Sequence, residues 1–238
     1  MSDYRKLATL YSMVEYYGTG YLVYRDLPEL INKYLNENIN TLRALDYGCG
    51  TGDSTRILTT LGFNDVIGVD VDEKMLSIAK SKDKKARFKL ISNADTKLPN
   101  ESIDIVLSCL VLMEVSTLDN MTKIFNEISR VLKNNGMFIL VVSNENLYKH
   151  DWLTVNTNFQ ENQNLKSGDV VRVELTDINL TILDYYWKEE DYINAIEKSN
   201  LELIEKVYAL GTDHDVYNWI SEYKYAPYST FILRKRMR

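Results

Sequence analysis

The stretch Leu45-Asp46-Tyr47-Gly48-Cys49-Gly50-Thr51-Gly52-Asp53 joins a buried strand, expected over residues 41–47, to a short helix expected over residues 53–61. Its three glycines permit positive φ angles and carry no Cβ, so a ligand can approach the backbone closely. The start of the following helix offers free amide N–H groups and a partial positive charge. A strand, a bare turn and a helix in this order predict a ligand-binding loop.

Helices and strands alternate on both sides of this loop. The expected helices cover residues 3–17, 27–38, 73–80 and 121–132, and the other expected strands cover residues 66–70, 88–92, 103–110 and 137–142. These strands are apolar throughout, which is typical of a parallel sheet that is covered on both faces. Right-handed crossovers then predict an α/β fold with a Rossmann-like, doubly wound and mostly parallel sheet.

The last third of the chain follows a different pattern. Residues 169–174 and 181–186 alternate apolar and polar positions around a turn at residues 177–179, which predicts an antiparallel β-hairpin. A helix over 189–198 and strands over 203–208 and 230–234 are expected to close the sheet. We interpret residues 1–238 as one domain. Its parts are an N-terminal helical cover (1–38), a cofactor-binding core (39–145), a substrate-side insertion carrying the hairpin (146–188) and closing elements (189–238).

Composition narrows the class of protein. The chain has 238 residues, 45% of them hydrophobic, and a formal net charge of -6, which argues against a nucleic-acid partner. The two cysteines lie far from any CxxC or Cys/His cluster, so we expect a reduced, cytoplasmic chain without a metal site. No apolar leader opens the sequence, and no apolar stretch approaches the ~18 residues of a membrane span.

An acidic residue follows the glycine loop at an informative distance. Asp70 ends the next expected strand, 22 residues after Gly48 (70 − 48), where a carboxylate can accept hydrogen bonds from ribose hydroxyls. Dinucleotides and S-adenosylmethionine both fit such a site. The glycines read GxGxG rather than GxGxxG, and Asp53 would repel a pyrophosphate. An aminoacyl tail carries an ammonium group and tolerates an acidic neighbour.

Five ordered segments resemble the motifs of class I S-adenosylmethionine-dependent methyltransferases. Residues 45–52 resemble the first motif, with Gly48, Gly50 and Gly52 as its glycines, and Asp70 resembles the acidic ribose ligand. Asn93-Ala94-Asp95 resembles the motif whose acid contacts the adenine amino group. Residues 103–106 and 130–136 resemble the fourth strand and the turn before the fifth. The resemblance covers roughly residues 40–145 and implies S-adenosylmethionine as cofactor and a seven-stranded sheet whose last strand is antiparallel.

Other candidate cofactor contacts have a structural alternative. Asp46 either only caps a turn or also holds the glycine loop against the cofactor. Val71 and Leu110 either flank the adenine ring or belong to the core. Arg25 either forms a bidentate pair with the methionine carboxylate or pairs at the surface with Asp26 or Glu29.

Methyl transfer from a sulfonium mainly needs alignment of the reacting atoms and exclusion of water, so few catalytic side chains are required. A general base is needed only if the acceptor must lose its proton early. His150 and Glu114 follow the fifth and fourth expected strands and can reach the crevice at the carboxyl ends of the strands. His214 lies between two aspartates and is expected to be solvated. Tyr17 either faces the sulfonium or the acceptor, or packs in the core.

The sequence therefore favours in-line methyl transfer to oxygen or nitrogen of a small-molecule acceptor, by a monomer or a homodimer with no nucleic-acid or membrane partner. One alternative is a non-catalytic module that binds S-adenosylmethionine. A nicotinamide-dependent oxidoreductase is disfavoured by the GxGxG spacing, by the second acid Asp95 and by the lack of a Tyr-x-x-x-Lys pair after the fifth strand.

Overall fold

The computed structural model describes residues 17–35 and 38–236, so nearly all of the helix expected over 3–17 lies outside the described residues. The main sheet has seven strands in the order β3 (Arg87–Leu90), β2 (Asp65–Asp70), β1 (Arg43–Tyr47), β4 (Ile103–Cys109), β5 (Leu132–Ser143), β10 (Tyr228–Lys235) and β9 (Leu201–Val207). Strand β10 runs antiparallel to both of its neighbours, and the pairs from β3 to β5 are parallel. The expectation of a mostly parallel, seven-stranded sheet with an antiparallel last strand is confirmed.

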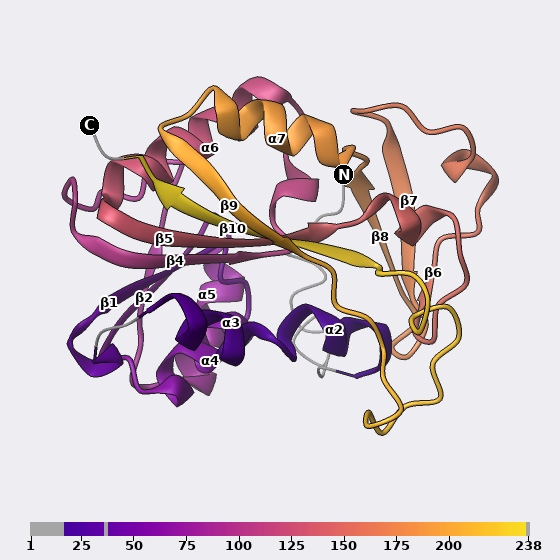
Figure 1. Cartoon of the computed structure of the whole chain (residues 1–238), viewed down its shortest axis with the longest axis horizontal. Helices are drawn as coiled ribbons and strands as arrows, with labels where there is room; N and C mark the ends of the chain where they lie inside the picture. The colour runs from indigo at the N-terminus through magenta and orange to yellow at the C-terminus, as the bar shows by residue number, and fades with distance from the viewer. Residues whose placement is uncertain (1–16, 36–37, 237–238) are drawn as a thin grey trace.

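Helices cover both faces of this sheet (Figure 1). One face carries α2 (Tyr21–Tyr24), α3 (Leu27–Tyr34), α4 (Asp53–Leu61) and α5 (Glu73–Lys82), and the other carries α6 (Leu118–Val131) and α7 (Glu189–Glu197). Successive β5 residues alternate between the two cores: Phe138 packs with the α6 and α7 side, and Ile139 with the α2 to α4 side. Burial on both faces is the reason why these strands read as continuous apolar runs.

A second sheet stands apart from the first, at the right of Figure 1. Strands β7 (Val170–Leu175) and β8 (Leu180–Tyr185) form the expected antiparallel hairpin, and Asn179 at its turn has φ 51°. A short strand, β6 (Val155–Asn156), which the sequence pattern did not predict, pairs with β7. The described residues also contain five 3-10 helices: η1 (Gly18–Gly20), η2 (Ile39–Thr41), η3 (Leu112–Glu114), η4 (Glu145–Tyr148) and η5 (Gln160–Asn162).

Several element boundaries differ from the sequence expectation, and two of these differences, at α6 and β5, have local reasons. Helix α6 begins at Leu118 rather than Met121, because the hydroxyl of Thr117 caps it by accepting from the Asn120 N–H at 3.2 Å. Strand β5 begins at Leu132 rather than at residue 137, so the turn that the resemblance implied within residues 130–136 is an irregularity inside the strand. The pairing jumps there from Ile103–Leu132 to Ile105–Met137.

A buried polar group joins three segments that cover the carboxyl ends of the strands. Glu222 is fully buried, and its carboxylate accepts from the Thr19 hydroxyl at 2.8 Å and from the Leu153 N–H at 2.9 Å. Thr19 and Thr154 also exchange two backbone-to-hydroxyl hydrogen bonds, of 3.0 and 3.1 Å. Helix η1, the residues before β6 and the loop of residues 208–226 are therefore held together as one cover.

Three further observations concern residues 17–35 and 38–236. Within these residues, no helix is both long and apolar enough to span a bilayer. No cluster of three or more histidine, cysteine, aspartate or glutamate side chains suited to a metal ion occurs in them either. Cys49 and Cys109 are buried free thiols, and burial raises the pKa of both well above the ordinary value, so neither is an activated nucleophile.

Candidate functional site

The glycine loop turns tightly over the end of β2. The N–H groups of Gly48 and Cys49 both donate to the Val69 carbonyl, at 2.8 and 2.9 Å. Gly48 has φ 75°, and a Cβ on it would lie 2.4 Å from Val111, in the segment that follows β4. Gly50 has φ 48°, and a Cβ there would meet nothing within 4 Å. The first glycine therefore permits close packing, whereas the second leaves bare backbone toward open space.

Gly52 has a different role from the two glycines before it. It is the left-handed residue that precedes α4, with φ 89°. A Cβ on Gly52 would lie 3.1 Å from the Cβ of Ala79 in α5, so its missing side chain lets the two helices approach. Gly52 does not line the cavity described below.

Asp70 is fixed by backbone donors at the carboxyl end of β2. One carboxylate oxygen accepts from the Gly50 N–H at 2.8 Å, and the other from the Asp72 N–H at 2.9 Å. Burial raises the pKa of Asp70, and these hydrogen bonds oppose the rise. A carboxylate oxygen has two lone pairs, so each oxygen keeps capacity for a ligand hydroxyl.

Asp46 lies behind the loop rather than in contact with the cavity. It is completely buried, and its Oδ2 accepts from the hydroxyls of Ser54 and Thr55, at 2.7 and 2.5 Å, in the first turn of α4. Its Oδ1 has no hydrogen-bond partner among the described residues. Burial raises the pKa of Asp46 to about 7. Asp46 thus ties the end of β1 to the start of α4, and in this way it shapes the glycine loop.

A cavity of about 490 Å³ opens between the glycine loop and the ends of β2 and β4. Seven of the expected site residues line it: Gly48, Gly50, Asp70, Val71, Ala94, Leu110 and Glu114. Val71 is 69% exposed, so it is an open apolar wall and not a core residue. We call this cavity the crevice. Its volume lies within the range of small-molecule and cofactor sites.

Asp95 lies next to the crevice but does not line it. Its carboxylate is paired with the Lys97 ammonium group and accepts from the Lys97 N–H at 2.9 Å. The pairing with Lys97 lowers the pKa of Asp95. Within the same motif, Ala94 is the residue that reaches the crevice.

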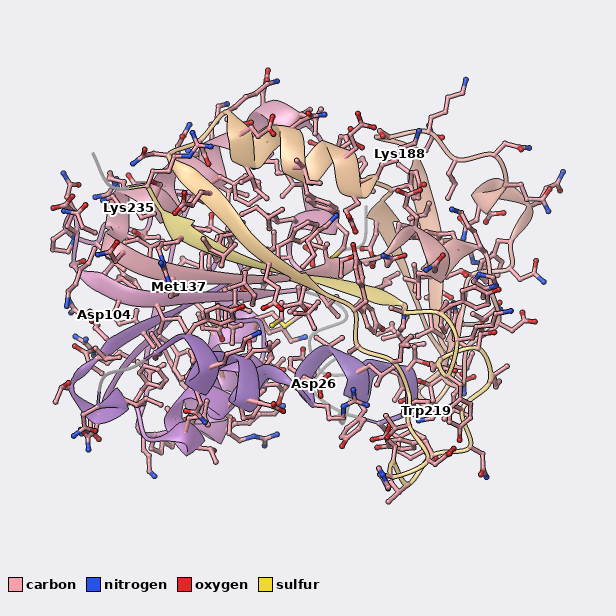
Figure 2. All side chains as sticks on the ribbon, viewed as in Figure 1. Asp26, Asp104, Met137, Lys188, Trp219 and Lys235 are labelled. Carbon is pink, nitrogen blue, oxygen red and sulfur yellow. The ribbon has the colours of Figure 1, made fainter. Side chains whose placement is uncertain are left out.

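Arg25 is held in the covering region. Its guanidinium donates to both carboxylate oxygens of Asp26, at 2.6 and 2.8 Å, and to the Leu210 carbonyl and Asp215, at 2.9 and 3.0 Å. Asp215 also accepts from the Trp219 indole N–H at 3.1 Å. Figure 2 shows Asp26 and Trp219 on the same side of the main sheet, beneath its ribbon. The pair with Asp26 is the alternative that the sequence left open, and Arg25 does not line the crevice.

The two remaining catalytic candidates lie in different places. His150 stacks on Tyr225, with ring centroids 3.7 Å apart, and lines a separate polar surface hollow rather than the crevice. Tyr17 packs edge-to-face on Tyr217 at 5.2 Å and lines a second cavity. Of the three catalytic candidates, the structure therefore brings Glu114 to the crevice and Tyr17 to its neighbour, and it keeps His150 away from both.

This second cavity has a volume of about 90 Å³ and lies between α2, the end of β5, β10 and the β6–β8 sheet. It shares Tyr24, Asp53 and Leu110 with the crevice, so the two cavities adjoin. Sequence reasoning did not assign Tyr24, Asp53 or the hairpin residue Asp184 to a site. The only available signals were the aromatic run before Pro28 and an aspartate at an inward position of the hairpin.

Comparison with known proteins gives a consistent picture. Residues 45–140 match the family model described as a methyltransferase domain. An uncharacterised protein of Methanocaldococcus jannaschii is 30% identical over 177 residues, which cover 71% of this chain and 64% of that protein. The N-demethylindolmycin N-methyltransferase of Streptomyces griseus is 28% identical over 158 residues, which cover 64% of this chain and 66% of that enzyme. The chain thus spans slightly less than two thirds of the length of either relative.

The fold is shared with solved structures. The crystal structure of an S-adenosylmethionine-dependent methyltransferase from Clostridium acetobutylicum superposes with a TM-score of 0.65. The match covers 99% of this chain and 100% of that one, at 21% sequence identity. A likeness at this identity supports the Rossmann-like fold of the whole described chain.

Proposed function

The chain carries a class I S-adenosylmethionine-dependent methyltransferase domain, and on that premise we propose that it transfers a methyl group to an oxygen or nitrogen atom of a small-molecule acceptor. The observation that carries the proposal is the joint position of Gly50 and Asp70. A bare backbone segment and a carboxylate fixed by it face the same crevice. This pairing suits an adenosyl donor, whose ribose needs an acceptor and whose bulk needs space.

The residues of the crevice fit S-adenosylmethionine. A side chain at Gly50 would project into space that the protein leaves open, and Asp70 retains acceptor capacity toward ribose hydroxyls. Val71 and Leu110 offer apolar surfaces to the adenine, next to Ala94. When bound, S-adenosylmethionine supplies a methyl carbon that an acceptor lone pair takes as the carbon–sulfur bond breaks and its electron pair returns to sulfur.

The charges of the crevice favour this donor over a dinucleotide. The described lining residues include Asp53, Asp70, Asp72 and Glu114 and no lysine, arginine or histidine. Asp53 lies at the first residue of α4, the point where a pyrophosphate would bind. Lys82 and Arg56 lie 3.5 and 3.6 Å from the Asp53 carboxylate and partly neutralise it. Asp70, Asp72 and Glu114 thus supply most of the negative charge that stabilises a cationic donor and repels a pyrophosphate. The nicotinamide-dependent alternative therefore has no support in the site.

The chain's own residues act by position. Tyr24, Asp53 and Leu110 lie where the crevice meets the second cavity, so they border the space between a bound donor and an acceptor. The covering segments joined through Glu222 contribute Gly20 and Thr154 to the lining of the second cavity, so they limit the access of water to a bound acceptor. Alignment and water exclusion are the main requirements of an in-line displacement. Glu114 and Tyr17 remain the candidates for an acid or base that contacts the acceptor.

The remaining features of the proposal concern partners and location. The small volume of the second cavity, about 90 Å³, favours a small acceptor over a nucleic acid or a membrane lipid. The buried free thiols Cys49 and Cys109 are consistent with a cytoplasmic chain. We propose that residues 1–238 form one domain that acts as a monomer or a homodimer.

The proposal is tested by the binding of S-adenosylhomocysteine to the Asp70→Ala variant. Calorimetry should show binding to the wild-type chain and a loss of about a hundredfold or more in affinity for the variant, because the ribose loses its acceptor. Asp65→Ala is the matched control, since Asp65 lies on the same strand but pairs with Arg43 and Arg87. NAD should give no heat.

Unchanged affinity in Asp70→Ala would contradict the assignment of the ribose site. Transfer of a labelled methyl group to a panel of small molecules then separates an enzyme from a non-catalytic binding module. A chain that binds S-adenosylhomocysteine but labels no acceptor would favour the module.

A further inference from the structure

The second cavity has a predominantly apolar wall. The apolar residues that line it come from α2, the segment after β4, η4 and the β6–β8 sheet: Val23, Leu110, Met113, Leu147, Val155, Val173, Leu175 and Ile182. Tyr17, Tyr24 and Tyr228 add ring surface. An apolar pocket of this kind selects a ligand body that is itself apolar, because water is released from both surfaces on binding.

The charged residues that line this cavity all have the same sign. They are Asp53, Asp177 and Asp184, and no lysine, arginine or histidine lines the cavity within the described residues. The three carboxylates differ in exposure: Asp177 is exposed in the hairpin turn, Asp53 is partly buried, and Asp184 is 4% exposed. Asp184 is therefore the carboxylate whose charge is least screened by water.

The position of Asp184 in the hairpin is unusual. Leu180, Ile182 and Asp184 are the inward residues of β8, and Asp184 is paired with the fully buried Val171. The first two inward positions are apolar, and a valine or leucine at the third would continue the row. A carboxylate at such a buried place costs desolvation free energy. The negative charge of Asp184 also acts on Tyr148: burial, and to a smaller extent Asp184, raises the pKa of the Tyr148 hydroxyl.

An apolar wall that carries carboxylates and no basic residue discriminates between classes of acceptor. A carboxylate or phosphate in this cavity would be repelled by Asp53, Asp177 and Asp184 and would find no basic partner in its lining. A neutral alcohol would gain the apolar contact but no charge interaction. An ammonium group on an apolar body gains both, and its interaction with a poorly hydrated carboxylate is strong.

We infer that the acceptor is an apolar amine whose ammonium group binds to Asp184 in the second cavity and passes one proton to that carboxylate, which frees the nitrogen lone pair that takes the methyl group. This inference rests on the proposed function, because it assigns the second cavity to the acceptor of the methyl transfer. It narrows the acceptor from small molecules in general to amines with a small apolar body, and it excludes carboxylic acids and phosphorylated compounds.

Matched ligands test the inference without any mutation. With S-adenosylhomocysteine at saturation, calorimetry would compare n-alkylamines from ethylamine to n-pentylamine, whose size suits a cavity of about 90 Å³, with the alcohol and the carboxylic acid of each carbon skeleton. We expect at least one amine to bind about tenfold or more tightly than its alcohol, and the acids not to bind. If no amine binds more tightly than its matched alcohol and acid, the inference is overturned.

The variant Asp184→Asn then identifies the carboxylate responsible. The preference for the amine over the alcohol should fall to about twofold or less, because asparagine keeps the shape but not the charge. Asp169→Asn is the matched control, since Asp169 is exposed just before the same hairpin and does not line the cavity. An amine preference that survives in Asp184→Asn would overturn the assignment to Asp184.

Binding of S-adenosylhomocysteine alone separates this inference from the function on which it rests. Wild-type chain, Asp184→Asn and Asp169→Asn should all bind it with the same affinity, because Asp184 does not line the crevice. If the wild-type chain binds no S-adenosylhomocysteine, the proposed function fails. If it binds S-adenosylhomocysteine but shows no preference for amines, the inference alone fails.

Discussion

The crevice and the second cavity adjoin, yet they are built in different ways. The crevice is lined largely by residues that directly follow β1, β2 and β4, so each wall is a short local segment. The second cavity is lined by residues from Tyr17 to Tyr228, which the fold gathers from both ends of the chain. The carboxyl ends of parallel strands necessarily meet at one edge of the sheet, whereas a cover must be assembled by packing.

The same difference predicts how each cavity responds to single substitutions. The glycine loop is held by backbone hydrogen bonds and by close contact with Val111, so its shape depends on a few positions that admit no side chain. The cover is held by side-chain groups such as Glu222, Thr19 and Arg25, each with several partners. We therefore expect single substitutions to affect the binding of S-adenosylhomocysteine strongly at the loop and weakly at the cover.

The largest loss of affinity for S-adenosylhomocysteine is expected for Gly48→Ala. Its Cβ would lie 2.4 Å from Val111, and its φ of 75° is unfavourable for alanine, so the loop must move. Calorimetry should show about a hundredfold or greater loss of S-adenosylhomocysteine affinity.

Gly62→Ala is the matched control for Gly48→Ala. Gly62 has φ 104° but nothing within 4 Å of a Cβ, and it lies at the far end of α4. This variant should lose about 1–2 kcal/mol of stability from strain and keep its affinity. Equal affinities for Gly48→Ala and the wild-type chain would show that the tight loop is not needed.

Asp46→Asn is expected to change the stability of the fold that holds the glycine loop, and this change depends on pH. Burial raises the pKa of Asp46 to about 7 in the folded chain, above its ordinary value of 3.8. The folded state therefore binds this proton more tightly than the unfolded state, and the stability it provides is full below about pH 4 and lost as pH rises to about 7. At about 1.4 kcal/mol for each pKa unit, the loss is at most about 4 kcal/mol.

Urea denaturation at several pH values between 4 and 8 would measure this effect. The difference in unfolding free energy between the wild-type chain and Asp46→Asn should shift in favour of the variant as pH rises. Taking the difference removes the contribution of Asp70, whose pKa is also raised by burial. A difference that does not change with pH would show that Asp46 is ionised throughout.

The smallest effect on cofactor binding is expected for Arg25→Ala. The guanidinium is engaged by Asp26, Asp215 and the Leu210 carbonyl, so its removal should loosen the cover rather than the crevice. Calorimetry should show S-adenosylhomocysteine affinity within about threefold of the wild type. A tenfold loss that Arg25→Lys does not restore would mean that the guanidinium binds the methionine carboxylate directly.

Much of the crevice was predictable because its signals are local. The spacing from Gly48 to Asp70 identified two walls, and helix α4 was predicted with its observed bounds, 53–61. Asp46 and Asp95 show the limit of such reasoning. Asp46 lies near the end of β1 and Asp95 follows β3, but Asp46 is held behind the loop by Ser54 and Thr55, and Asp95 pairs with Lys97. Side-chain direction at these positions depends on neighbours that spacing does not reveal.

By itself, the sequence determined the order of helices and strands, the doubly wound sheet and the bare loop that faces Asp70, because apolar periodicity and glycine conformations are local properties. Only the tertiary structure decided that Arg25 turns to Asp215, that His150 stacks on Tyr225, and that Asp184 joins Tyr24 and Tyr228 around one cavity. The hydrogen bond from Arg25 to Asp215 connects residues 190 positions apart, and contacts of this range form only when the covering segments pack together.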